Sequence, residues 1–229
     1  MKKTMIVSIA SLIFLTLCSL VGWLFRFAPS KDAVLFVVLG LVICAVSGFF
    51  LFLFKKHAVM YWIAYFLNAF ALGLCIRGWY IFRNYDNPLW LMLLISLIAT
   101  LYLWVFYLFL RIPFFNQHYI AFTIFYMLIS IICYVLVIVL TKTTYVSTYG
   151  WYMMIEIAFV FALSIEAEDR LEIFQHTVLS TYSVLVVAIL MLIIMLAGDS
   201  ADFSFDGSVF DSFSSSSSSK KKKRTKRIK

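Results

Sequence analysis

Seven long stretches of apolar residues constrain this chain more than any other feature of its sequence. They cover about residues 5–26, 34–54, 58–82, 89–110, 119–141, 149–166 and 177–197. Each is close to the ~20 residues that an α-helix needs to cross ~30 Å of hydrocarbon. The stretches are continuous and do not alternate every second residue, so they favour helices over barrel strands. The sequence therefore predicts an all-α polytopic membrane bundle of seven transmembrane helices in residues 1–197.

Composition excludes the common soluble classes. Hydrophobic residues make up 64% of the chain and charged residues 13%, whereas a soluble domain has about 45–50% and about 25%. A chain of this kind has too little polar surface to cover itself in water. The four cysteines lie in four different predicted spans and form no C-x-x-C pair, so neither a disulfide framework nor a thiol-redox motif is indicated.

The orientation of the predicted bundle depends on the positive charges of its loops. We name the side of the N-terminus side A and the other side B. Outside the tail, side A carries six Lys or Arg residues and side B five, which barely separates them by the positive-inside rule. The apolar run after Lys2 and Lys3 is longer than the core of a signal peptide, which favours a retained anchor. We therefore expect a multi-pass protein of the cell membrane with a cytoplasmic N-terminus.

Residues 198–229 form a separate low-complexity segment. Asp and Phe alternate in its first part, six serines follow at 214–219, and a basic block ends the sequence. The composition predicts a disordered, solvated tail. An alternative is that its positive charges bind anionic lipid headgroups, through Lys220, Lys221, Lys222, Lys223 and Arg224. No folded reader with aromatic platforms accompanies these charges, so nucleic acid is not an expected partner.

Ionisable residues at membrane depth are rare because each is costly there. Arg77, about five residues before the end of the third predicted span, and Glu156, about seven residues into the sixth, are both expected near side B. Since these spans are antiparallel, the two charges are predicted to reach the same level and to pair. Asn68 is the deepest amide of the third span and faces away from Arg77.

Three interpretations of these residues remain open, one of which leaves the charges unpaired and snorkelling toward the membrane surface. Of the other two, the first is a structural ion pair that orients the helices. The second is a ligand or ion pathway opening on side B, with Tyr152 at its mouth and Arg83 and Asp86 just above it.

A second candidate site lies on side A. His57, His118 and His176 fall in three different side-A connections, with Glu172 close to the last. Imidazole and carboxylate both suit Zn²⁺ or Fe²⁺, so an intramembrane metal-dependent hydrolase is the alternative function. The spacing matches no H-x-x-x-H or H-E-x-x-H motif.

The remaining motifs favour a non-enzymatic protein. The sequence has no nucleophile elbow, P-loop or dinucleotide-binding pattern, and no cofactor is expected. Gly40, Cys44 and Gly48 form a small-residue groove for close helix packing, or alternatively for a homo-oligomer or a partner membrane protein. We expect a role in transport, ligand sensing or assembly of a membrane complex. Broken helices or an inverted repeat would favour transport, and the sequence pattern predicts neither.

Overall fold

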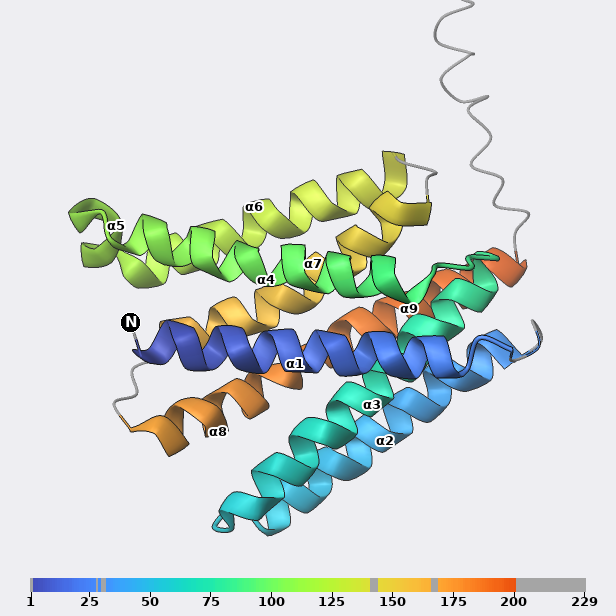
Figure 1. Ribbon diagram of the computed structural model, residues 1–229, viewed down its shortest axis with the longest axis horizontal. Helices are drawn as coiled ribbons and strands as arrows, with labels where there is room; N and C mark the ends of the chain where they lie inside the picture. Colours follow the sequence, from blue (N-terminus) through green and yellow to red (C-terminus); the bar gives the residue numbers. More distant parts are fainter. Residues whose placement is uncertain (1, 28, 30–31, 141–143, 166–168, 201–229) are drawn as a thin grey trace, which may run out of the picture. The chain divides into compact units, whose positions relative to one another are not determined.

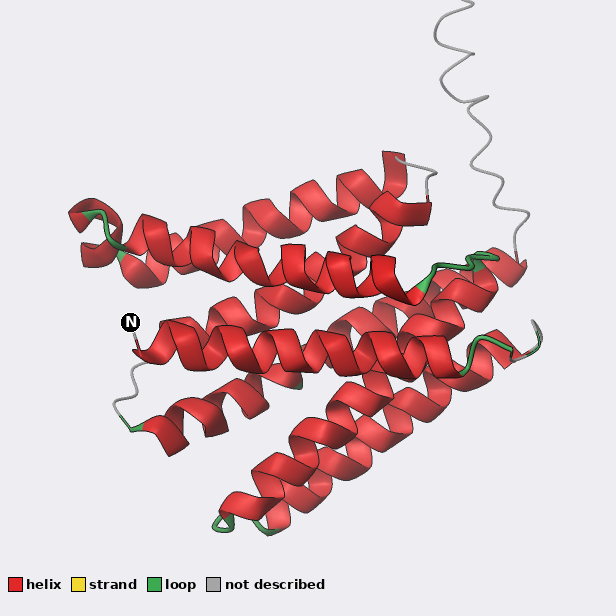
Figure 2. Cartoon of the chain, in the orientation of Figure 1, coloured by secondary structure: helices red, strands yellow, loops and turns green. Residues whose placement is uncertain are grey.

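The computed structural model describes residues 2–27, 29, 32–140, 144–165 and 169–200. Within these ranges the regular structure is helical (Figures 1 and 2), which agrees with the predicted all-α class. The helices in chain order are α1 Lys2–Leu24, α2 Ala33–Leu53, α3 Ala58–Phe82, α4 Leu89–Leu110, α5 Pro113–Gln117, α6 Tyr119–Leu140, α7 Thr144–Ser164, α8 Arg170–Thr181 and α9 Val184–Ser200. The predicted tail falls, from residue 201 onward, outside the described ranges. The chain divides into two units, Met1–Ile193 and Ile194–Lys229, and the packing below is that of the first.

Several of the helices are long and apolar enough to cross a membrane. Five segments meet this criterion within the described part of the chain: Lys3–Leu24, Ala33–Leu53, Ala58–Phe82, Leu89–Leu110 and Arg170–Leu196. Tyr119–Tyr134 and Thr148–Ser164 are shorter apolar helical segments. These lengths are compatible with a multi-pass membrane protein, although five segments rather than the predicted seven meet the criterion.

The distribution of side chains suits lipid rather than water. Large apolar side chains of α2 are exposed, with Phe52 at 74%. Hydroxyl side chains such as those of Ser11, Ser19 and Ser96 are instead completely buried. Polar groups buried among the helices find partners there, whereas apolar side chains facing outward lose nothing in hydrocarbon.

Glycines allow α1, α2 and α3 to pack closely in the lower part of Figure 1. A Cβ atom on Gly40 of α2 would lie 2.5 Å from the carbonyl oxygen of Ala71 on α3. A Cβ atom on Gly73 of α3 would lie 2.6 Å from the Cβ atom of Val21 on α1. At Gly40 the predicted small-residue groove is therefore filled by another helix of the same chain.

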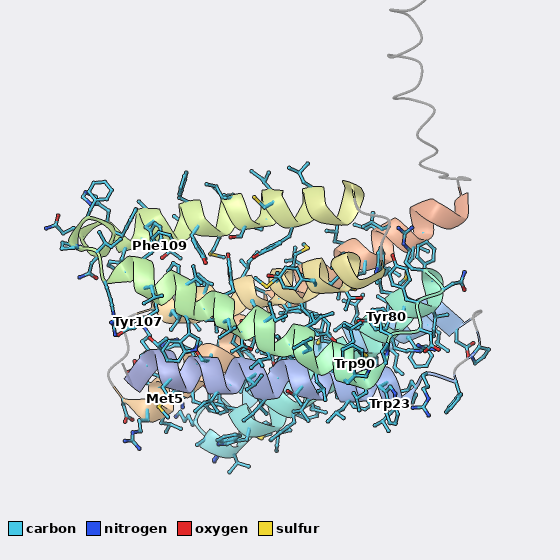
Figure 3. All side chains as sticks on the ribbon, turned by 45° about the horizontal axis from the view of Figure 1, so that its top comes forward. Met5, Trp23, Tyr80, Trp90, Tyr107 and Phe109 are labelled. Carbon is cyan, nitrogen blue, oxygen red and sulfur yellow. The ribbon has the colours of Figure 1, made fainter. Side chains whose placement is uncertain are left out.

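On its other side, α1 packs against α4 and α7, and α6 packs against α7. The Phe14 ring of α1 is completely buried and meets Phe159 of α7 edge-on, with 5.5 Å between ring centroids. Figure 3 shows Met5, Tyr107 and Phe109 toward one end of the bundle and Trp23, Tyr80 and Trp90 toward the other. The three helices α1, α4 and α7 enclose the polar residues discussed below.

The last predicted span, 177–197, is not one continuous helix. Tyr182 and Ser183 interrupt it between α8 and α9, and their N–H groups bond to carbonyl oxygens only three residues back, at 3.2 and 3.1 Å. The hydroxyls of Ser180 and Thr181 also bond to carbonyl oxygens three residues back, both at 2.7 Å. Such local bonds compete with the regular helical ladder, so this hydroxyl-rich turn breaks the helix that hydropathy alone predicts to be continuous.

Candidate functional site

Glu156 is a completely buried carboxyl group in the middle of the bundle. It projects from α7, while its neighbours come from the middle of α1 and α4. Ser11 of α1 donates a hydrogen bond to Oε1, and the Thr100 hydroxyl of α4 lies 3.5 Å from the same oxygen. The second oxygen, Oε2, has no hydrogen-bond partner among the described residues. Glu156 thus sits among neutral hydroxyls.

A second polar level lies about one helical turn away on α4 and α7, and about two turns away on α1. The Tyr152 hydroxyl of α7 is 2.8 Å from Ser19 Oγ on α1, and Ser19 Oγ is 3.1 Å from Ser96 Oγ on α4. Ser96 and Thr100 are joined because the Thr100 hydroxyl donates to the Ser96 carbonyl oxygen at 2.9 Å. We name the five residues Ser11, Ser19, Ser96, Thr100 and Tyr152 the hydroxyl line. The Ser96 carbonyl oxygen accepts but cannot donate, so the hydroxyls form two bonded groups. Tyr152, Ser19 and Ser96 make the first, and Thr100 and Ser11 make the second, which contacts Glu156.

An open cavity of about 320 Å³ lies at the end of the bundle where α1 and α3 terminate. We name it the arginine cavity. Its lining includes Arg26, Phe27, Arg77, Tyr80, Tyr85 and Asp86. The buried Tyr80 lies beside Tyr152, so the cavity wall adjoins the hydroxyl line.

The structure corrects the predicted pairing of Arg77 with Glu156. Arg77 donates through Nη2 to the carbonyl oxygen of Arg26, and Glu156 takes the hydroxyl partners just described. α7 begins at Thr144, five residues before the predicted start. Glu156 therefore lies twelve residues into α7, about 18 Å from its start, whereas Arg77 lies about 8 Å from the end of α3. The two charges are at different levels and have no ion pair within the described ranges.

Of the other predicted site residues, Asp86 lines the arginine cavity with Arg77. Arg83 lies outside that lining and places its guanidinium 5.6 Å from the Trp79 ring centroid. Asn68 belongs to neither site. Its Nδ2 atom donates to Thr181 Oγ1 at 2.8 Å, and its buried Oδ1 atom has no partner in the described part of the chain. Asn68 therefore contacts the interruption between α8 and α9.

The three histidines of the predicted metal site do not gather. His57 precedes α3, His118 follows α5, and His176 lies within α8, 3.8 Å from Glu172. No group of three or more His, Cys, Asp or Glu residues suited to a metal ion occurs among the residues that the structure describes. The geometry thus lends no support to the metal-dependent hydrolase.

The sequence analysis did not single out the partners of Glu156. Ser11 and Ser19 on the first helix, and Ser96 and Thr100 on the fourth, are small hydroxyl residues inside apolar runs. Their spacings of eight and four residues place each pair on one helix face. The mean hydropathy of each run does not reveal this regular spacing, because a single serine or threonine changes that mean very little.

Comparison of the chain with models of protein families, with curated proteins and with solved structures finds no match. The described residues define a helical protein with several apolar helices of membrane-spanning length and a set of polar side chains buried among them.

Proposed function

We propose that this chain is a multi-pass protein of the cell membrane that transports protons, with Glu156 as the residue that binds and releases them. The observation that carries this proposal is the setting of Glu156. Its carboxyl group is completely buried and is contacted by the hydroxyls of Ser11 and Thr100. Within the described ranges no basic side chain forms an ion pair with it.

A structural role is less consistent with this setting. An ionised carboxylate inside a membrane bundle is costly unless a positive charge compensates it. If Glu156 served only to hold helices together, a neutral amide in its place would make the same bonds at lower cost. A carboxyl differs from an amide in that it can gain and lose a proton. Intramembrane carboxyls are accordingly typical of proton relays.

The hydroxyl line supplies two parts of a route for the proton. Ser19 lies within hydrogen-bonding distance of both Tyr152 and Ser96. Thr100 and Ser11 lie next to Glu156, with 3.4 Å between their hydroxyl oxygens. Tyr80 adjoins Tyr152 and lines the arginine cavity. Each hydroxyl can donate and accept. The Tyr80 hydroxyl has no hydrogen-bond partner in the described part of the chain, and Thr100 meets Ser96 at its carbonyl oxygen. A proton passing between the cavity and Glu156 therefore requires a side-chain rotation or a water molecule at these two positions.

The interruption between α8 and α9 also favours transport. Broken membrane helices leave backbone groups free to rearrange, and they are typical of transporters. Here the break is contacted by Asn68 of α3 and by Ser47 of α2, whose hydroxyl is 2.9 Å from the Tyr182 hydroxyl. Movement at this break would change the packing around α3 and so offer a means of opening the bundle.

The proposed arrangement has seven spans, with α6 and α7 as the fifth and sixth and the α8–α9 segment as the last. α6 and α7 are 22 and 21 residues long, which is enough to cross ~30 Å at helical rise. The N-terminus is proposed to be cytoplasmic, with Lys2 and Lys3 on that side. The basic residues Lys220–Lys223 and Arg224 remain proposed contacts for anionic headgroups.

The test is proton flux into proteoliposomes under an imposed membrane potential, followed by a pH-sensitive dye trapped inside. We expect wild-type protein to conduct and Glu156→Gln to fall to the level of protein-free liposomes. Glu156→Asp should retain part of the flux because it keeps the carboxyl. Asp32→Asn, which removes a carboxylate just before α2, should match wild type. Equal flux through monodisperse Glu156→Gln and wild-type protein, or no flux through wild-type protein, would contradict the proposal.

A further inference from the structure

The geometry points to a second site, separate from Glu156: the arginine cavity binds a zwitterion, with an oxyanion group at Arg77 and Arg26 and an ammonium group near Asp86. Two positively charged side chains and one negatively charged side chain line this cavity of about 320 Å³. That volume far exceeds the ~10–15 Å³ that a single water molecule requires. The inference does not depend on proton transfer at Glu156.

Arg77 is the anchor of the oxyanion half. It is 7% exposed, and its Nη2 atom donates to the Arg26 carbonyl oxygen. Its Nε atom is buried without a partner in the described part of the chain. A guanidinium group has five N–H donors in a planar fork, so a single carbonyl oxygen leaves most of them unused. Phosphate and carboxylate groups match that fork with two parallel hydrogen bonds.

Arg26 supplies the second positive charge of this half. Its guanidinium carbon lies 4.0 Å from the Trp23 ring centroid and 4.5 Å from the Phe27 ring centroid. These stacking contacts use the faces of the guanidinium and leave its N–H edge for hydrogen bonds. It has no ion pair within the described ranges.

Asp86 makes a simple anion site less suitable than a zwitterion site. Its carboxylate lines the same cavity and attracts Arg77, yet the two form no ion pair within 4.0 Å among the described residues. The cavity also lies where α1 and α3 end, and helix C-termini carry partial negative charge. With Asp86, these ends offset the two arginines. Positive and negative side chains that line one cavity without contacting each other are complementary to a ligand that carries both a positive and a negative charge.

The aromatic side chains complete the ammonium half. Tyr80 and Tyr85 line the cavity with 6.3 Å between their ring centroids. Tyrosine rings attract ammonium groups through their faces. The backbone holds Tyr85 and Asp86 in place because Asn84 adopts a left-handed conformation with φ 53°. The Tyr85 N–H then donates to the Tyr80 carbonyl oxygen at 2.8 Å, and the Asn84 N–H donates to the Ile81 carbonyl oxygen at 3.2 Å. These two hydrogen bonds cap the C-terminus of α3.

Two sources offer this chemistry, a soluble zwitterion and the headgroup of a phospholipid, and the experiment separates them. In the soluble arm, thermal shift of the full chain in detergent measures the affinity for O-phosphoethanolamine, with inorganic phosphate and ethanolamine as half-ligands. In the lipid arm, native mass spectrometry compares retention of phosphatidylethanolamine with that of phosphatidylglycerol, which lacks the ammonium group.

We expect Arg77→Gln and Arg77→Lys to weaken zwitterion binding by at least about tenfold, since a hydrogen bond to a charged group contributes about 1.5–3 kcal/mol. Asp86→Asn should weaken binding of the zwitterion and strengthen binding of inorganic phosphate. Arg111→Gln removes an exposed arginine outside the lining, at the end of α4, and serves as the charge-matched control. If Arg77→Gln does not fold, Arg77→Lys and Arg26→Gln carry the test.

Binding of O-phosphoethanolamine above both half-ligands, lost in the Arg77 and Asp86 variants, supports a soluble zwitterion. Preferential retention of phosphatidylethanolamine, lost in the same variants, supports a headgroup. The inference is overturned if neither arm shows specific binding, if folded Arg77 variants bind as wild type does, or if Asp86→Asn leaves the preference for the zwitterion intact.

Discussion

Ser11 of α1 donates a hydrogen bond to Oε1 of Glu156 on α7. This bond joins two helices through an uncharged donor at the middle of the bundle. Both residues are completely buried. Hydroxyl groups solvate a carboxyl without fixing its charge, whereas an arginine or lysine would hold it ionised. The Ser11–Glu156 contact therefore accommodates the change of protonation that the proposed function needs.

Ser11→Ala is expected to lower the free energy of unfolding by about 1–3 kcal/mol, because a buried acceptor loses its donor. Unfolding in a detergent–denaturant titration measures this change. Thr16→Val is the control on the same helix, since Thr16 is only half-buried and the variant keeps its shape. A loss no larger in Ser11→Ala than in Thr16→Val would contradict the structural assignment.

Gly73→Ala is expected to destabilise the bundle by about 1–3 kcal/mol through overpacking. The new Cβ atom would lie 2.6 Å from Val21 Cβ and 2.9 Å from the Cys18 carbonyl oxygen, so α1 and α3 must separate. Gly22→Ala is the matched control because its nearest neighbour is the flexible Met92 Cε atom at 3.4 Å. Gly22→Ala should be neutral, or more stable by up to about 1 kcal/mol from helix propensity. Equal melting temperatures of the two variants would show that α1 and α3 pack less closely than the structure describes.

Asn84→Val is expected to cost about 1–2 kcal/mol, because the left-handed conformation of residue 84 is unfavourable for a side chain branched at Cβ. Asn84→Gly, which adopts positive φ freely, should retain or increase stability. Thermal melts of the two variants in detergent decide the point. If Val is tolerated as well as Gly, the capping turn that positions Tyr85 and Asp86 is not as described.

Hydropathy predicts the helical class well because a helix in lipid needs a long apolar run, whichever helices it packs against. It places α3 at 58–82 and α4 at 89–110, as observed. Helix starts depend on more local features. The hydroxyl-rich residues after Thr144 lower the mean hydropathy, so the sixth predicted span begins too late, and Glu156 is assigned too shallow a position. The predicted pair with Arg77 fails for that reason.

The candidate site was predictable only in part. Arg77 and Asp86 are recognisable as charges near one end of the third span, and they share a cavity. The partners of Glu156 depend on which faces of α1 and α4 meet α7, which requires the three-dimensional packing. The break at Tyr182 depends on hydroxyl–carbonyl bonds that hydropathy does not register.

The proposed seven spans predict the accessibility of one position before α6 and one after it. In a background without the four native cysteines, a cysteine at Asn116 should be labelled from the side of the N-terminus by a membrane-impermeant maleimide. A cysteine at Lys142 should be labelled from the opposite side, because one span separates the two positions. Labelling of both from the same side would mean that α6 does not cross, and would contradict the arrangement of seven spans.

The separation of Arg77 from Glu156 makes a double-mutant cycle informative. Arg77→Gln should perturb the contact with the Arg26 carbonyl oxygen. Glu156→Gln changes instead the group that accepts a hydrogen bond from Ser11. Because the two residues share no partner, their effects on the free energy of unfolding should add to within about 0.5 kcal/mol. The parallel cycle of Ser11→Ala with Glu156→Met, which removes the acceptor oxygens, should show coupling above that level, since these residues are in direct contact. Coupling between Arg77 and Glu156 as large as that between Ser11 and Glu156 would restore the ion pair and remove the basis for proton binding at Glu156.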